Sequence, residues 1–174
     1  MVIKIYGHGG QGIDTTRKII GKAMLLSGFY AQDFIISGLE RRPDKVYGFV
    51  KFDKKPILSK QIERPDIVLV FDSDMINEAK EIKENGIALF NITEKINLSY
   101  MKEKKVKTFS IDANSIVFGL TKKPIPNIAM LGAFTKIFDK ISIKNMKFAI
   151  QEELGDAREN LIIFDEGYKN VKKC

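Results

Sequence analysis

The chain has 174 residues, which suits one domain and is long enough to bury a substantial core without metal or disulfide support. Lys and Arg outnumber Asp and Glu by 29 to 22, giving a formal net charge of +7. The single cysteine, Cys174, excludes an intrachain disulfide and a cysteine-rich zinc or iron–sulfur site within this chain.

The sequence has no run of about eighteen apolar residues and no signal-peptide pattern, so we expect no membrane segment and a cytoplasmic location. The lysines are scattered along the chain, which is typical of a solvated surface. The alternative is a positive electrostatic field that attracts anionic ligands or an acidic protein partner. No basic stretch with interleaved aromatics accompanies them, so no nucleic-acid partner is expected. Abundant Lys, Glu and Ile suit a thermophile, although an AT-rich genome produces the same bias.

The most informative stretch lies at the start of the chain. Val2–Tyr6 is a β-branched and aromatic run typical of a strand, and a helical pattern begins at Ile13. Between them lie Gly7, His8, Gly9, Gly10, Gln11 and Gly12. Glycines allow a tight turn and let backbone amides approach a bound group, and the helix start favours phosphate or carboxylate.

Two interpretations of this glycine turn stay open from spacing alone. Gly7, Gly9 and Gly12 match the G-x-G-x-x-G pattern of dinucleotide sites, and Asp33 stands where the ribose-binding acid is expected. The same glycines equally suit a turn that only packs a helix tightly on a strand. His8 is either ligand-facing or simply exposed.

The expected helix at Ile13–Leu26 carries Thr15 and Thr16 in its first turn, as caps or as ligand contacts. An extended segment is predicted at Phe29–Phe34 and a loop at Ile35–Leu39. The polar residues that follow predict an exposed turn or a subunit contact. Two of them are adjacent arginines, whose guanidinium groups suit carboxylates and phosphates. These residues are Glu40, Arg41, Arg42 and Pro43.

The middle of the chain predicts strands separated by turns and helices. Lys45–Phe52 alternates as a strand does, and Ile67–Phe71 is apolar throughout, as expected of a central strand buried on both faces. Asp72 and Asp74 follow it, as helix caps or as ligand contacts at the carboxyl end of a strand. Met75–Glu84 predicts a helix.

Two further buried strands are predicted at Ile87–Ile92 and Val106–Ile111. This alternation indicates one Rossmann-like domain over 1–174, a three-layer α/β/α fold with a largely parallel, mixed sheet. The last third is expected to be helical, with patterns at Ala113–Leu120, Ile128–Phe138, Ile143–Leu154 and Ala157–Tyr168. Gly132 and Ala133 are small enough to let another element approach closely, in the core or at an interface.

Three stretches together resemble the gamma subunits of pyruvate and 2-ketoisovalerate ferredoxin oxidoreductases. They are Gly7–Gly12 after the first strand, Leu39–Arg42 before the third, and Pro126–Phe134 near the end. The resemblance covers nearly the whole chain. Two departures are Pro43-Asp44-Lys45 in place of a glycine and a small residue, and His8 in place of the more usual arginine. They leave open a specialised member with other partners or another substrate.

The resemblance implies a non-catalytic subunit of an enzyme that oxidatively decarboxylates a 2-oxoacid to an acyl-CoA. That enzyme uses thiamine diphosphate, iron–sulfur clusters and coenzyme A, and passes electrons to ferredoxin. The implied partners are alpha, beta and delta-type subunits, with the glycine turn and the arginine turn near a shared face or the coenzyme A path. This chain alone is expected to hold no cofactor, metal or catalytic residue. Expressed alone, the chain could form a homodimer, and the apolar stretch Ile128–Phe138 is one candidate surface for it. The alternative function is a stand-alone module for NAD or coenzyme A.

Overall fold

The computed structural model describes residues 1–37, 45–59, 61, 63–94, 97–121, 125–155 and 158–174. Through them runs a seven-stranded sheet in the order β2-β3-β1-β4-β5-β6-β7. The strands are β1 (Val2–His8), β2 (Tyr30–Ser37), β3 (Lys45–Asp53), β4 (Ile67–Val70), β5 (Ile87–Asn91), β6 (Lys107–Ile111) and β7 (Lys172–Lys173). β1, β4, β5 and β6 are parallel, whereas β2, β3 and β7 join antiparallel to their neighbours. The sheet is therefore mixed, with β4 in the middle as predicted.

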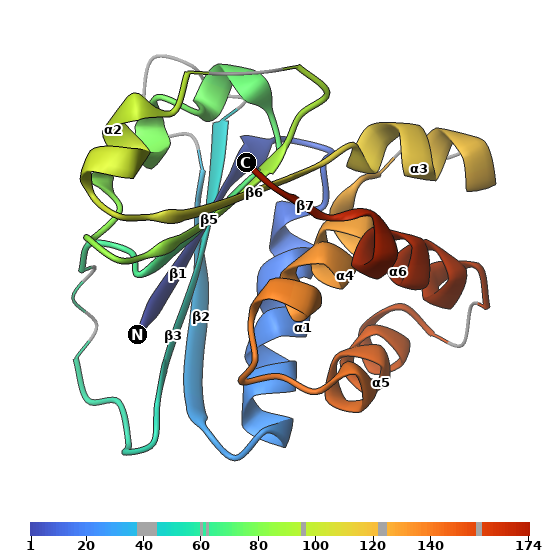
Figure 1. Cartoon of the computed structure of the whole chain (residues 1–174). Helices are drawn as coiled ribbons and strands as arrows, with labels where there is room; N and C mark the ends of the chain where they lie inside the picture. The colour runs from blue at the N-terminus through green and yellow to red at the C-terminus, as the bar shows by residue number, and fades with distance from the viewer. Residues whose placement is uncertain (38–44, 60, 62, 95–96, 122–124, 156–157) are drawn as a thin grey trace.

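The sheet is covered on both faces, which confirms the three-layer α/β/α fold (Figure 1). One face carries the longer helices α1 (Ile13–Leu26), α4 (Asn127–Ile137), α5 (Ile143–Leu154) and α6 (Arg158–Asn170), with α3 (Ala113–Leu120) beside them. The other face carries two 3-10 segments, η1 (Ser73–Met75) and η2 (Glu78–Glu81), and the short helix α2 (Ser99–Glu103). The predicted helical last third is thus confirmed.

The alternation of side chains along the strands divides the apolar core in two. In β4, Ile67 and Leu69 face the longer helices, whereas Val68 and Val70 face the 3-10 segments. All four are fully buried, as expected of a strand covered on both sides. The division follows from the two-residue period of a strand.

The predicted helix at Met75–Glu84 is wrong, because the chain forms η1 and η2 there instead. Its buried apolar residues after Met75 are Ile76, Ala79 and Ile82, each three positions from the next. A spacing of three matches the 3-10 helix, whose turn holds three residues, better than the α-helix. The covering on this face is therefore made of short elements.

The predicted loop at Ile35–Leu39 is also wrong over its first part, because β2 continues through Ser37. Ile35, Ile36 and Ser37 pair with Gly48, Tyr47 and Val46 of β3, so tertiary pairing extends the strand. No sequence pattern predicted β7, which adds two residues antiparallel to β6. The predicted helix Ile143–Leu154 matches α5 at both ends.

The helices α4 and α6 approach each other closely enough for their backbones to touch. A Cβ on Gly132 would lie 2.1 Å from the carbonyl oxygen of Phe164, and one on Gly167 would lie 2.1 Å from that of Ala129. Glycine at both positions therefore lets the two backbones touch, which confirms the close approach expected at Gly132. Residues 127–135 of α4 are all buried, so the apolar 128–138 stretch belongs to the core. The expectation that this stretch is a surface for self-association is therefore wrong.

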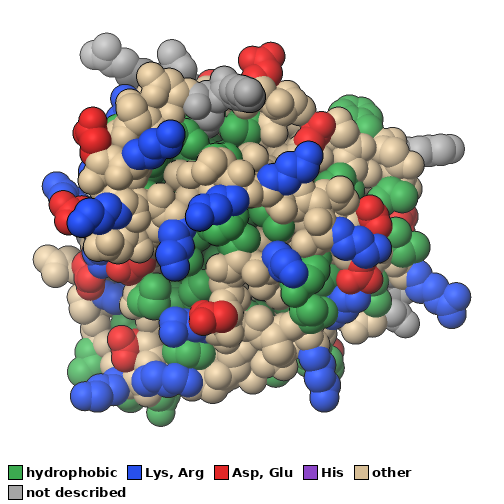
Figure 2. Space-filling model, in the orientation of Figure 1, with side chains coloured by type: hydrophobic (Ala, Val, Ile, Leu, Met, Phe, Trp, Pro, Cys, Tyr) green, Lys and Arg blue, Asp and Glu red, His purple; other side chains and the backbone are tan. Residues whose placement is uncertain are grey.

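Figure 2 shows lysine and arginine side chains spread over the visible face with acidic side chains among them, as expected of a solvated surface. Many are paired: Asp14, for example, accepts hydrogen bonds from Arg17 and Lys18. Within the described ranges, no helix is both long enough and apolar enough to cross a bilayer.

Glu78 anchors η2 to the sheet, and its carboxylate is expected to make the stability of the fold depend on pH. Burial raises the pKa of Glu78, but hydrogen bonds from Lys45 and from the Tyr47 hydroxyl (2.6 Å) outweigh it and leave the pKa below its ordinary value of 4.5. The stabilisation is therefore present above that value and is lost as the pH falls through the lowered pKa. We expect Glu78→Gln to cost about 1 kcal/mol at neutral pH.

The measurement is thermal unfolding of wild type and Glu78→Gln from neutral pH down to about pH 3. The difference in melting temperature should shrink as the pH falls, since the wild-type carboxylate becomes protonated. A difference that stays constant over this range would contradict the assignment.

Candidate functional site

The glycine turn joins the end of β1 to the start of α1. Gly7 is buried inside β1, where a Cβ would lie 2.5 Å from Cδ1 of Ile13. Gly10 and Gly12 have φ angles of 87° and 78°, in the left-handed region that favours glycine. Gly9 and Gly10 are exposed, and a Cβ on either would meet no atom within 4 Å. The tip of the turn is thus open to a ligand or to another chain.

Gln11 fixes the turn to the neighbouring strand end. Its side-chain oxygen accepts a hydrogen bond from the amide of His8 at 2.8 Å, and its Nε2 donates to Oδ2 of Asp72 at 3.0 Å. Asp72 follows β4 and also caps η1 by accepting from the amide of Asp74 at 3.5 Å. The predicted capping role of Asp72 is confirmed, and Gln11 joins it to the glycine turn.

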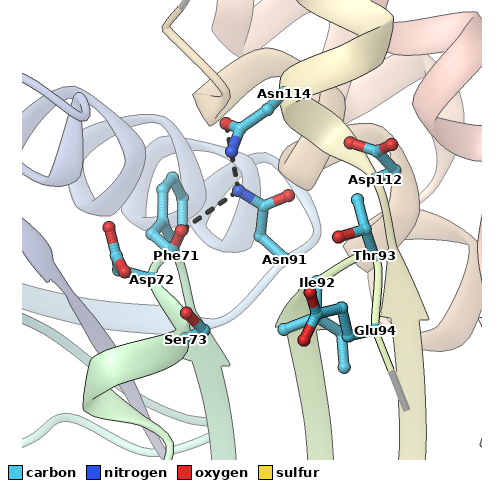
Figure 3. A pocket seen from close by; sticks show the side chains of 9 residues that line it. All are labelled: Phe71, Asp72, Ser73, Asn91, Ile92, Thr93, Glu94, Asp112 and Asn114. Atoms are coloured by element: carbon cyan, nitrogen blue, oxygen red, sulfur yellow. Dashed lines mark hydrogen bonds between the residues drawn. The ribbon is translucent and has the colours of Figure 1, made fainter.

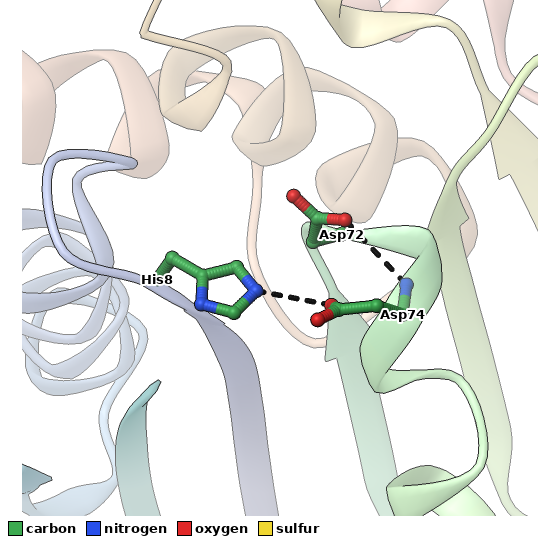
Figure 4. Close-up of side chains that lie close together, drawn as sticks. All are labelled: His8, Asp72 and Asp74. Carbon is green, nitrogen blue, oxygen red and sulfur yellow. Dashed lines mark hydrogen bonds and ion pairs between the residues drawn. The ribbon is translucent and has the colours of Figure 1, made fainter. Parts of the chain in front are cut away.

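His8 turns toward the same strand end (Figure 4). Its Nε2 lies 3.0 Å from Oδ1 of Asp74. Potential ligand atoms of His8, Asp72 and Asp74 all lie within 4.8 Å of one another, close enough to contact one metal ion. The hydrogen bonds from Gln11 and between His8 and Asp74 already account for this arrangement, so the expectation that the chain holds no metal stays a prediction.

A polar cavity of about 250 Å³ opens beside this cluster at the carboxyl ends of β4, β5 and β6 (Figure 3). Its lining includes the carboxylates of Asp72, Glu94 and Asp112 and the side chains of Asn91 and Asn114. Asp112 caps α3 through the amide of Ser115 at 2.9 Å. The carboxyl edge of a parallel sheet is the usual place for ligands in α/β folds, and here it is polar and acidic.

Asn91 is a buried residue that organises this cavity, and its role was not predicted from the sequence. Its Nδ2 donates to the carbonyl of Phe71 at 3.0 Å and to Oδ1 of Asn114 at 3.2 Å, while its Oδ1 accepts from the amide of Ala113 at 2.9 Å. The available signal was an asparagine at the end of the apolar run Ile87–Ile92. Its amide joins the ends of β4 and β5 to the start of α3.

Asn91→Ala is expected to cost about 2 kcal/mol of unfolding free energy, because it leaves the buried amide of Ala113 and the carbonyl of Phe71 without this partner. Chemical denaturation would measure the loss. Asn114→Ala is the matched control, since Asn114 is exposed and gives up only the bond to Asn91. Equal losses from the two variants would contradict the central role of Asn91.

Gly12 brings the first and the last sequence motifs together. A Cβ on Gly12 would lie 2.7 Å from Nδ2 of Asn127, the first residue of α4. Thr16 does not cap the helix but donates its hydroxyl back to the carbonyl of Gly12 at 2.8 Å. The glycine turn and the start of α4 therefore pack against each other.

Asp33 lies away from the turn. It sits in β2 and forms an ion pair with Arg17 of α1, and β3 separates β2 from β1. A ribose-binding acid normally follows the strand next to the glycine-rich one. This placement does not favour the dinucleotide interpretation, which titration calorimetry with NAD, NADP and coenzyme A tests directly.

The arginine turn, Glu40, Arg41 and Arg42, lies outside the described residues. The strand ends that flank it can be placed: Ser37 pairs with Val46, and Lys45 pairs with His8. Both ends therefore lie at the edge of the sheet that carries the glycine turn, and the role of the three residues stays a prediction.

The geometry defines a class of protein: an α/β/α domain whose first strand ends in an exposed, amide-rich turn beside a polar cavity. The model of the pyruvate ferredoxin/flavodoxin oxidoreductase family matches residues 2–170. The common gamma subunit of the pyruvate/ketoisovalerate oxidoreductases of Pyrococcus furiosus is 36% identical over 165 residues, covering 88% of this chain and 89% of that one. The pyruvate synthase subunit PorC of Methanocaldococcus jannaschii is 36% identical over 153 residues, covering 85% and 83%.

Solved structures agree with these relatives. The crystal structure of the pyruvate oxidoreductase subunit PORC of Thermotoga maritima superimposes with a TM-score of 0.80 at 25% identity, over 99% of this chain and 97% of that one. In the 2-oxoglutarate:ferredoxin oxidoreductase of Magnetococcus marinus the same fold covers 97% of this chain but 30% of that one, with a TM-score of 0.79 at 19% identity. The chain belongs to the pyruvate ferredoxin/flavodoxin oxidoreductase family.

Proposed function

We propose that this chain is the gamma-type subunit of a 2-oxoacid:ferredoxin oxidoreductase. In this role it supports the oxidative decarboxylation of a 2-oxoacid to an acyl-CoA, while alpha, beta and delta-type subunits carry the chemistry and pass electrons to ferredoxin. The observation that carries the proposal is the match of the family model over residues 2–170, together with full-length relatives named gamma subunit or PorC.

The glycine turn is the proposed contact with a partner subunit or with coenzyme A. Gly9 and Gly10 are exposed with open space around them, and no described residue accepts a hydrogen bond from their amides. Glycine offers no side chain for bond making, so the turn suits binding rather than catalysis. Coenzyme A is present in the Magnetococcus marinus oxidoreductase, and its phosphates match the amides and the helix start of such a turn.

The cofactors of the proposed enzyme divide between the subunits. An iron–sulfur cluster is held by four cysteine thiolates, and this chain has a single cysteine, so its residues do not fit a cluster. Thiamine diphosphate is assigned, by family resemblance, to the boundary between alpha and beta subunits. In this proposal the chain contributes surface and positioning.

The experiment is affinity purification of the tagged full chain from its native host. We expect larger alpha and beta chains to co-purify, and we expect the purified complex to reduce ferredoxin in a reaction that requires a 2-oxoacid and coenzyme A. A chain that purifies alone, in a host whose 2-oxoacid-dependent ferredoxin reduction is unaffected by its deletion, would overturn the proposal.

The role of the turn needs its own variant. Gly9→Asp adds a carboxylate at an exposed position with open space, so folding should be preserved while an anion or an acidic partner surface is repelled. We expect weaker assembly or a raised KM for coenzyme A. Unchanged assembly and kinetics would exclude the turn as the contact and leave the subunit assignment intact.

A further inference from the structure

The outer edge of β2 is a strand edge that plays no part in the proposed function. β2 lies at one end of the sheet order and pairs with β3 in an unbroken register over all eight of its residues. In an antiparallel pair, every second residue directs its N–H and C=O groups away from the partner strand. Among the described residues, only those of β3 hydrogen-bond to the backbone of β2. The outward backbone groups of β2 are therefore open to a further strand.

This edge lacks the protection that the opposite edge of the sheet has. β7, at the other end of the sheet order, has two residues, Lys172 and Lys173, so it is both short and charged. Natural proteins use short strands, lysines, prolines and bulges to keep strand edges from pairing. β2 has eight residues with no lysine, arginine or proline among them, and Tyr30 and Ile35 on it are 52% and 36% exposed. Such an edge is suited to strand addition.

The charges of β2 allow a second copy of the same chain to approach. The chain has a net charge of +7, so its lysine-rich surfaces repel another copy. β2 contains no basic residue, and its single charged side chain, Asp33, forms an ion pair with Arg17 of α1. Two β2 edges can therefore meet without bringing basic side chains of the two strands together.

The aromatic side chains of β2 and β3 favour one register for such a pair. A two-fold axis perpendicular to the sheet keeps each face of the sheet continuous and passes through a residue that meets its own copy. The ring of Phe34 stacks on that of Phe49 in β3, with centroids 4.9 Å apart and planes 9° apart. With Phe34 at the axis, its copy continues this aromatic row, and aromatic pairs across strands are stabilising. An axis at Asp33 would instead oppose two carboxylates.

We propose that the chain forms a symmetric homodimer in which β2 pairs antiparallel with β2 of a second copy, with Phe34 at the two-fold axis. In this register, Asp33 lies opposite Ile35 of the second copy, and Gln32 lies opposite Ile36. The two seven-stranded sheets become one continuous sheet. The proposal is independent of the proposed function, because the glycine turn follows β1, and β3 separates β1 from β2.

The first test is the mass of the full chain by sedimentation equilibrium. We expect a reversible equilibrium between the 19.7 kDa chain and a dimer of twice that mass, with a Kd of about 10 µM. Ile35→Asp should weaken the dimer at least about tenfold, because the new carboxylate lies opposite Asp33 of the second copy. Ile162→Asp is the matched control, since Ile162 is 53% exposed in α6 and should leave the dimer unchanged.

Two results of this measurement would overturn the proposal. One is a chain that stays monomeric at about 100 µM, ten times the expected Kd. The other is an equal effect of Ile35→Asp and Ile162→Asp on the dimer. Either result leaves the subunit assignment intact.

The second test determines the register by disulfide formation, with Cys174→Ser removing the only native cysteine. Phe34→Cys should give a disulfide-linked dimer on mild oxidation, because directly opposed residues of antiparallel strands lie about 4.5–5.5 Å apart. Ile36→Cys is the control on the same face of β2. Its copy lies four positions along the strand, about 13 Å away, which is beyond the reach of a disulfide. Equal cross-linking of the two variants, or none from Phe34→Cys, would overturn the proposal.

Discussion

Gly132→Ala is expected to destabilise the fold strongly, although it adds a single methyl group. Its Cβ would lie 2.1 Å from the Phe164 carbonyl oxygen and 2.8 Å from the Tyr168 nitrogen, so it meets backbone that cannot rotate away. α4 and α6 must separate, and a buried helix loses its contacts. We expect a loss of about 4 kcal/mol and a melting temperature lowered by roughly 8–16 °C.

Thermal unfolding followed by circular dichroism would measure this loss. Gly119→Ala is the matched control, since Gly119 also lies in a helix, α3, and its added Cβ would meet no atom within 4 Å. Alanine should be neutral or slightly stabilising there. If both variants melt together with wild type, the close approach of α4 and α6 is wrong.

Gly12→Ala should have the next largest effect, because two costs add at one position. Alanine at a φ of 78° is strained, and its Cβ would lie 2.7 Å from Nδ2 and 2.9 Å from Cγ of Asn127. We expect a loss of about 3 kcal/mol, measured by chemical denaturation. Gly10→Ala isolates the strain, since its φ is 87° with open space around it, and should cost about 1 kcal/mol.

A double-mutant cycle tests the contact between the two motifs. Asn127→Ala removes the two closest atoms, so Gly12→Ala should be less harmful in its presence than alone. Strictly additive losses would show that the glycine turn and the start of α4 do not meet as described.

The sequence was most informative where local pattern and tertiary packing agree. The twelve residues of α5 combine a Ser142 cap with an apolar stripe, and both helix ends were predicted. The buried run of β4 and the Asp72 cap followed from the same logic. By contrast, residues 75–84 carry helix-forming residues at a spacing of three, and packing on the sheet selected two 3-10 turns.

The candidate site was only partly predictable, because its decisive contacts join distant residues. The glycine turn could be located from the spacing of its residues. The bonds from Gln11 to Asp72 and from His8 to Asp74, however, join residues that are 61 and 66 positions apart in the sequence. Gly12 could be recognised as a turn residue, yet its packing against Asn127 depends on the placement of α4. Asn91 gave a weak signal, since one polar residue at a strand end is also typical of a cap.

The unequal covering of the sheet bears on how the molecule moves. One face is held by helices of 11–14 residues, whereas the other depends on segments of 3, 4 and 5 residues, η1, η2 and α2. Such short segments can open at low free energy while the rest stays folded. Their amides should exchange with deuterated solvent well before those of α4. The strand ends beside the glycine turn border this layer, so their amides should exchange earlier than those in the middle of the sheet.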